Sequence, residues 1–106
     1  LELNEADRQA IAQAVQSCEE RCVVITHGTD TMTLTAQFLQ PGEKTIVLTG
    51  ALSPARFAKS DATFNVGMAF AAVQALPPGV YIVMNGQVFA AGQVRKDLEK
   101  NVFVRC

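Results

Sequence analysis

Three short runs of the chain are apolar at almost every position and rich in β-branched residues. They occupy positions 22–26 (CVVIT), 45–49 (TIVLT) and 80–84 (VYIVM). Runs without alternating polar positions are typical of strands covered on both faces, as in parallel sheets packed between helices. We therefore predict three buried parallel strands.

The segments before and between these runs repeat apolar residues at helical spacing. The first predicted helix runs from Asn4, a residue suited to capping, to about position 20, and the second covers 31–39 and stops before Pro41-Gly42. A third covers about 61–76, and its predicted buried face carries Phe64, Met68, Ala72 and Ala75. Strands that alternate with helices in this way predict an α/β fold: a three-layer sandwich around a mostly parallel, doubly wound sheet of flavodoxin or Rossmann type. Weaker apolar groups at 88–89 and 102–104 predict short additional strands.

Composition and charge narrow the class of protein. The 106 residues correspond to about one domain, and 49% hydrophobic with 18% charged residues is typical of a globular chain. Nine basic against ten acidic residues argue against nucleic acid as a partner, and no apolar run reaches the roughly 18 to 20 residues of a membrane span. Three cysteines without metal-ligand spacing, and no visible signal peptide, lead us to expect a cytoplasmic protein.

Polar residues follow each predicted strand, where the carboxyl ends of parallel strands bind ligands in this fold class. The segment after the first strand combines Gly28, Thr29 and Asp30. The Thr29 hydroxyl could act as a nucleophile once activated, or position a water. The Asp30 carboxylate suits an ammonium group, but from the pattern alone we favour an N-cap role for an aspartate just before a helix.

Two further residues are ambiguous from the pattern alone. His27 is the one histidine of the chain, so no paired-histidine metal spacing exists. We favour a structural, hydrogen-bonded role for it over a role as a catalytic base. Lys96 could be a base or an electrostatic helper if it lies away from water beside a hydroxyl. Otherwise it is an exposed charge next to Arg95 and near Lys100.

Several of these segments together resemble the bacterial-type L-asparaginases. Positions 25–32 (ITHGTDTM) are similar to the second signature of that family, and 47–51 (VLTGA) and 83–85 (VMN), followed by Lys96, continue the similarity in the same order. Ser60-Asp61 and Phe64-Asn65 fit as well. The resemblance implies that residues 1–106 form an asparaginase N-terminal-type α/β domain. It also leads us to expect that the domain is incomplete at its N-terminus.

The resemblance implies amide hydrolysis, of L-asparagine or a related side-chain amide, to L-aspartate and ammonia by threonine-based catalysis. Thr29, Asp30 and Lys96 correspond to one catalytic set of the family, which needs neither metal nor organic cofactor. Gly28, Thr29, Asp30 and Ala51 correspond to substrate-binding positions, with Asp30 receiving the α-ammonium group and backbone N–H groups stabilising an oxyanion. The family's other catalytic threonine lies in a Thr-Gly-Gly-Thr-Ile loop, and no such motif occurs in the 106 residues.

Two other functions stay open at this point. The chain could bind an amino acid without hydrolysing it, or be a regulatory paralogue built on the same fold. For the amide hydrolase the resemblance implies a small-molecule amino-acid amide as partner and a homo-oligomer, either dimer or tetramer. Asparagine, glutamine and other amide substrates are not distinguished by the sequence.

Overall fold

The computed structural model describes residues 3–52 and 60–106, which contain three helices and six strands. In chain order these are α1 (Glu5–Ser17), β1 (Cys22–Thr26), α2 (Met32–Phe38), β2 (Thr45–Thr49), α3 (Ala62–Ala75), β3 (Gly79–Met84), β4 (Gln87–Ala90), β5 (Val94–Asp97) and β6 (Val102–Arg105). The three strands predicted from apolar runs are therefore present, as are the three helices.

The main sheet has the order β1-β2-β3-β4. The first three strands are parallel, with Val24 opposite Val47 and Val47 opposite Tyr81, whereas β4 runs antiparallel along β3. All five residues of β2 are buried, as expected for a strand with neighbours on both sides, and β1 forms an edge of the described sheet. The mostly parallel sheet confirms the predicted fold class.

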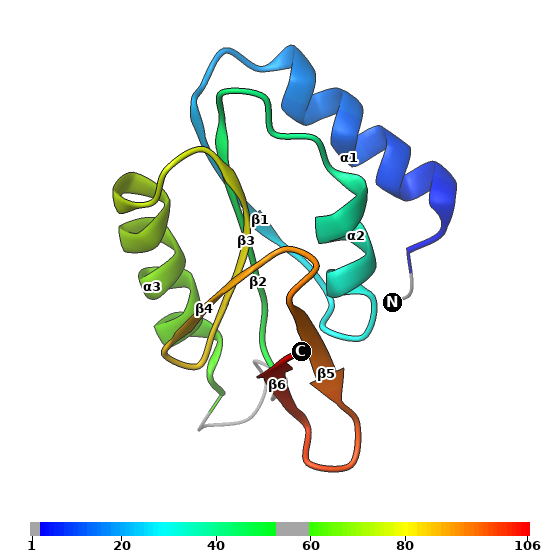
Figure 1. Cartoon of the computed structure of the whole chain (residues 1–106), viewed down its shortest axis with the longest axis vertical. Helices are drawn as coiled ribbons and strands as arrows, with labels where there is room; N and C mark the ends of the chain where they lie inside the picture. The colour runs from blue at the N-terminus through cyan, green and yellow to red at the C-terminus, as the bar shows by residue number, and fades with distance from the viewer. Residues whose placement is uncertain (1–2, 53–59) are drawn as a thin grey trace.

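Helices cover both faces of this sheet and complete three layers (Figure 1). One face packs against α1 and α2, and the other packs against α3. Side chains that alternate along β2 and β3 point to opposite layers. Toward α1 and α2 lie Ile46, Leu48, Ile82 and Met84, with Val15, Met32 and Ala36 against them; toward α3 lie Val47 and Val83, with Ala69 and Val73 against them.

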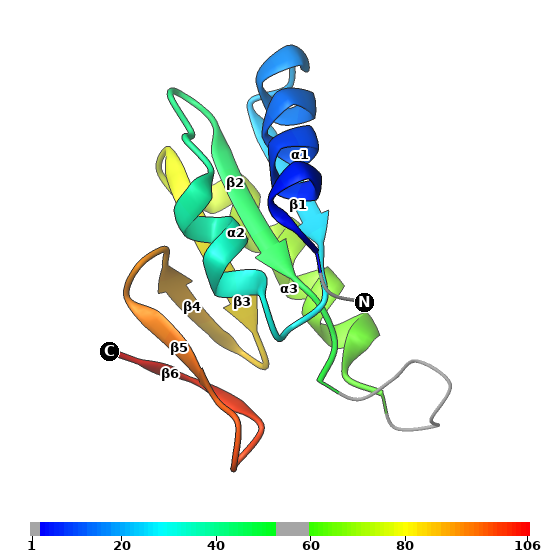
Figure 2. The ribbon, with the colours of Figure 1, turned by 90° about the vertical axis from the view of Figure 1, so that its right-hand side faces the viewer.

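The two parallel crossovers have opposite hands. The chain steps from β1 to β2 and on to β3 in one direction across the sheet, but α2 and α3 lie on opposite faces. Figure 2 shows α2 in front, with the strands pointing down and β1, β2 and β3 from right to left, which makes β1–α2–β2 right-handed. The connection β2–α3–β3 is therefore left-handed, a hand found in about one of fifty such units.

The helix ends and faces follow from local chemistry. Asn4 begins α1 with a reciprocal capping box, because its side chain accepts from the Asp7 N–H at 2.8 Å while the Asp7 carboxylate accepts from the Asn4 N–H. The predicted buried face of α3 is only partly confirmed: Met68 and Ala72 pack against the core, but Phe64 is 58% exposed and Asn65 is fully buried. Since α3 is apolar around most of its circumference, its hydrophobic period does not select one face.

One strand of the structure was not predicted. β5 pairs antiparallel with β6, with Lys96 opposite Phe103, in a hairpin separate from the main sheet. Its sequence, Val-Arg-Lys-Asp, carries three charged residues in four and lacks the apolar character of a strand. The hairpin matters for function because it packs against α2 and carries Lys96 to the carboxyl ends of the parallel strands. Across the described ranges, no helix is both long and apolar enough to cross a membrane.

Candidate active site

The segments after β1 and β2 lie against each other at the carboxyl edge of the sheet. The His27 N–H donates to the Thr49 carbonyl at 2.9 Å. A Cβ atom on Gly50 would lie 2.3 Å from the His27 carbonyl oxygen, closer than any such contact allows. Glycine at position 50 therefore lets the two backbones approach, and it places Ala51 beside the segment that holds Gly28 and Thr29.

Lys96 reaches this edge from the hairpin and contacts both polar residues of the first segment. Its Nζ atom donates to Thr29 Oγ1 at 2.8 Å and to Asp30 Oδ1 at 2.6 Å. The Lys96 side chain is 11% exposed, whereas the Asp30 side chain is 73% exposed. Lys96 is thus a largely buried ammonium beside a hydroxyl, and the interpretation of this residue as a freely exposed charge is wrong.

Asp30 does not cap α2. The N-cap position belongs to Thr31, and no side chain makes a capping hydrogen bond there. Instead the hydrogen bond from Lys96, and secondarily its positive charge, lower the pKa of the Asp30 carboxyl below its ordinary value. Asp30 consequently presents a carboxylate that is ionised and open to solvent, beside an ammonium that is shielded from it.

His27 is held at both ring nitrogens. Nδ1 lies 2.6 Å from the Gly28 carbonyl oxygen and Nε2 lies 2.8 Å from Thr35 Oγ1. A carbonyl oxygen only accepts, so we assign the proton to Nδ1, and Nε2 of the neutral ring then accepts from the Thr35 hydroxyl. Because the ring is 8% exposed and Thr35 is fully buried, the structural interpretation of His27 fits better than that of a free catalytic base.

A buried amide on α3 joins the ends of β2 and β3, and the sequence pattern assigned it no role. Asn65 Nδ2 donates to the Gly50 carbonyl at 2.8 Å, and Asn65 Oδ1 accepts from the Asn85 N–H at 2.8 Å. The carboxylate of Asp61 accepts from Asn65 Nδ2, from Asn85 Nδ2 and from the Leu52 N–H. An asparagine within a mostly apolar helix that has no charged residue is the sequence signal that could have indicated this network.

The predicted site residues thus fall into two groups. Thr29, Asp30 and Lys96 are in direct hydrogen-bond contact. Gly28 and Ala51 contribute backbone on the two adjoining segments. The structure establishes this arrangement, while the catalytic and binding roles of the five residues stay predictions.

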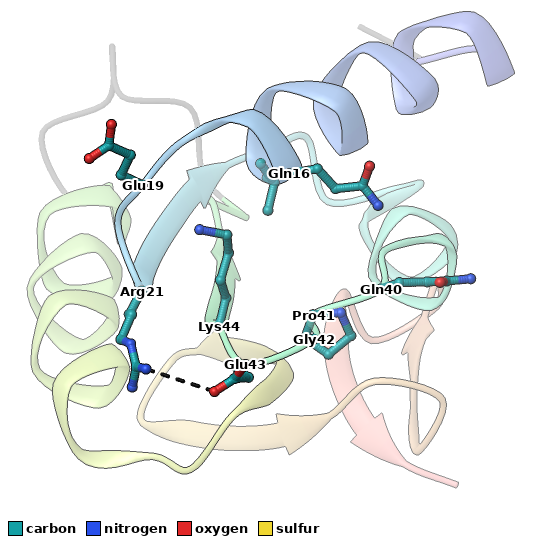
Figure 3. A pocket seen from close by; sticks show the side chains of 9 residues that line it. Gln16, Glu19, Arg21, Gln40, Pro41, Gly42, Glu43 and Lys44 are labelled. Carbon is teal, nitrogen blue, oxygen red and sulfur yellow. Dashed lines mark ion pairs between the residues drawn. The ribbon is translucent and has the colours of Figure 1, made fainter.

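A cavity of about 400 Å³ lies at the opposite, amino-terminal end of the strands, beside α1 (Figure 3). Three of its four charged lining residues, Arg21, Glu43 and Lys44, have structural partners. Arg21 and Glu43 form an exposed ion pair at 3.8 Å, and Lys44 donates to the carbonyl oxygens of Cys18 and Glu20 after α1. This cavity is remote from Thr29 and contributes nothing to the predicted chemistry.

Comparison with known proteins identifies the family of this chain. The family model "Asparaginase, N-terminal" matches residues 2–102. The chain belongs to the asparaginase family. Among curated asparaginase-family relatives, the glutaminase-asparaginase of Acinetobacter glutaminasificans is 42% identical over 82 residues, which cover 72% of this chain and 25% of the relative.

Other members of the asparaginase family differ in their named function. A glutamyl-tRNA(Gln) amidotransferase subunit of Methanococcus vannielii is 39% identical over 83 residues, covering 76% of this chain and 19% of that protein. The solved structure of the thermostable L-asparaginase from Thermococcus kodakarensis matches with a TM-score of 0.84 at 30% identity, over 97% of this chain and 34% of that one. This asparaginase-family chain therefore spans about a fifth to a quarter of the length of the curated relatives it matches.

Proposed function

We propose that the carboxyl edge of the sheet is an asparaginase-type site for the hydrolysis of a side-chain amide, L-asparagine or a related amino-acid amide, to the acid and ammonia. One observation carries the proposal: Lys96 Nζ lies within hydrogen-bond distance of both Thr29 Oγ1 and Asp30 Oδ1. A hydroxyl, a shielded ammonium and an ionised carboxylate are the groups that this reaction uses in the family.

In the proposed reaction Thr29 either attacks the amide carbon or orients the water that does. In the first case a bond forms between Thr29 Oγ1 and the carbonyl carbon, the carbon–nitrogen bond breaks, and the hydroxyl proton leaves with ammonia. Water then hydrolyses the ester to release the carboxylate. The Lys96 ammonium activates the hydroxyl, because it stabilises the negative charge that develops on the oxygen.

Asp30 supports this set and binds the substrate. Its exposed carboxylate is positioned to pair with the α-ammonium of an amino acid while the Lys96 ammonium neutralises part of its charge. Backbone N–H groups of Thr29 and Ala51 are candidates for stabilising the oxyanion. Relatives named for asparagine, glutamine and glutamyl-tRNA(Gln) chemistry support an amide of this kind without selecting one.

The test uses the purified 106-residue chain with L-asparagine and L-glutamine, and measures ammonia release with a coupled enzyme assay. Titration calorimetry with L-aspartate measures binding in parallel. Thr29→Ala is the informative variant, and Thr33→Ala is its control because Thr33 is a half-buried threonine on the neighbouring helix. We expect Thr29→Ala to lose most ammonia release and Thr33→Ala to retain it.

The outcomes separate the candidate functions. Equal turnover by the wild-type chain and Thr29→Ala would exclude a catalytic role for that hydroxyl. Binding of aspartate without release of ammonia would favour the amino-acid-binding module, the alternative that the sequence left open. A chain that neither binds nor hydrolyses would overturn the proposal.

A further inference from the structure

We propose that His27 and Asn65 are a pair of positioning residues that aim two backbone N–H groups, those of Thr29 and Ala51, at the ligand. This inference rests on the proposed function, since the N–H groups would bind the carboxylate or oxyanion of an amino-acid ligand. Neither side chain is expected to touch the ligand. Each holds the carbonyl of a peptide group whose other end carries one of the two donors.

The first peptide group is Gly28–Thr29. Its carbonyl oxygen accepts from His27 Nδ1 at 2.6 Å, and the ring is fixed from behind by Thr35 at 2.8 Å. In a trans peptide the carbonyl and the N–H point in opposite directions, and no described peptide bond is cis. The Thr29 N–H therefore points away from His27.

The second peptide group, Gly50–Ala51, is held in the same way. Its carbonyl oxygen accepts from Asn65 Nδ2 at 2.8 Å, so the Ala51 N–H points away from α3. Asn65 is itself fixed because Oδ1 accepts from the Asn85 N–H and Nδ2 also donates to Asp61. Both carbonyl-holding side chains are buried, at 8% exposure for His27 and 0% for Asn65.

Both N–H groups are left available by this arrangement. Within residues 3–52 and 60–106, neither the Thr29 N–H nor the Ala51 N–H donates to another protein group. The two segments lie backbone against backbone through the close approach of Gly50 to His27. Two such N–H groups, fixed before a ligand arrives, would suit an anionic oxygen, because a preorganised donor need not be reoriented during the reaction.

The orientation of each N–H is measurable without any ligand. Residual dipolar couplings of the 15N-labelled chain report the direction of the Thr29 and Ala51 N–H bonds, with the β2 amides as an internal reference. His27→Gln keeps an amide near Nε2 but loses the donor to Gly28, whereas His27→Asn retains a donor near Nδ1. Asn65→Asp replaces the amide N–H donor to the Gly50 carbonyl by a carboxylate oxygen, which cannot donate. Gln74→Glu makes the same amide-to-carboxylate change on the exposed side of α3 and serves as the control.

We expect His27→Gln to alter the Thr29 coupling and Asn65→Asp to alter the Ala51 coupling, with the β2 couplings unchanged. His27→Asn and Gln74→Glu should leave the Thr29 and Ala51 couplings near their wild-type values. Titration with L-aspartate should show affinity reduced about tenfold or more in the two disruptive variants, the loss expected for one misdirected hydrogen bond to a charged oxygen. Where asparagine is hydrolysed, kcat should fall more than KM rises.

Unchanged Thr29 and Ala51 couplings in the disruptive variants would overturn the inference, as would equal changes throughout the sheet. If the couplings change as expected but the wild-type chain does not bind aspartate, the positioning role stands and the proposed function is wrong. If aspartate binds equally well to the wild type and both disruptive variants, the two N–H groups do not serve the ligand and the inference fails.

Discussion

Replacement of Lys96 by methionine is the sharpest perturbation of the candidate site. Methionine retains the apolar stem of the side chain, which is 11% exposed, and removes the ammonium that donates to Thr29 Oγ1 and Asp30 Oδ1. Packing of the hairpin against α2 should therefore survive. The change isolates the charge from the bulk of the residue.

The structure predicts a large effect on activity and a small one on stability. A positioned group that assists proton transfer contributes about 10²- to 10⁴-fold in rate, so ammonia release should fall by that factor. The Thr29 hydroxyl is half-buried and can turn to water once Lys96 is gone, which limits the loss of stability from this hydrogen bond to about 1 kcal/mol. The pair with the exposed Asp30 adds little, because solvent screens it.

Three measurements check this prediction on the same protein. Ammonia release gives the loss of activity, and urea unfolding gives the change in stability. An NMR titration of the Asp30 carboxyl should show its pKa returning toward the ordinary value, because the hydrogen bond from Lys96 is the largest cause of its lowering. Lys100→Met is the matched control, since Lys100 is exposed in the turn between β5 and β6.

If the Asp30 carboxyl has the same pKa in the wild type and in Lys96→Met, the prediction is refuted. That result would mean that the two groups do not pair in solution. An activity loss shared equally by Lys100→Met would point instead to a general effect of removing positive charge.

Four other substitutions test the surrounding structure. Gly50→Ala should destabilise the fold by about 2 kcal/mol or more, because the added Cβ would meet the His27 carbonyl oxygen. Gly67→Ala, whose added Cβ lies in open space on α3, should stabilise the fold by about 0.5 to 1 kcal/mol. Thermal unfolding measures both changes. Asn65→Leu should cost about 3 kcal/mol in urea unfolding, since it leaves the part-buried Gly50 carbonyl and Asn85 N–H without this hydrogen-bond partner, and a cost near zero would contradict the network. Asp30→Asn should lower stability at pH 7 but not near pH 2. Because folding lowers the pKa of the Asp30 carboxyl, the carboxylate stabilises the fold at pH values above its ordinary pKa of 3.8. This stabilisation is lost as the pH falls through the pKa of the folded state. Equal losses at both pH values would show that the effect is not ionic.

The layers of the fold could be predicted because the strands are continuous apolar runs. β2 is buried at every position, and a five-residue apolar run rich in β-branched residues is too short for a helix and too apolar for a loop. The face of α3 could not be predicted, because both its sides are apolar and only a hydrogen-bonding partner in space decides that Asn65 points inward. β5 was missed for the opposite reason, since its charged residues are stabilised by pairing with β6 rather than by burial.

For the site, sequence pattern located the segments but not their contacts. Thr29 and Asp30 follow a predicted strand, which places them at the carboxyl edge without further information. Lys96 lies 67 positions beyond Thr29, and only the hairpin brings its ammonium to 2.8 Å from the hydroxyl. From local pattern alone it was indistinguishable from an exposed lysine, and the family resemblance rather than the pattern assigned it to the site.

The left-handed crossover gives the site a property that a right-handed one would not. His27 is held by Thr35 on α2, and Asn65 projects from α3, so the two adjoining peptide groups are fixed from opposite faces of the sheet. Had β2–α3–β3 been right-handed, α3 would lie on the same face as α2, and Asn65 would have to reach Gly50 from the side that His27 and Met32 already fill. The Gly28 and Gly50 carbonyls are therefore held from opposite layers of the sheet. The rare hand of this connection is therefore a condition for the arrangement of the candidate site, and not an incidental feature of the topology.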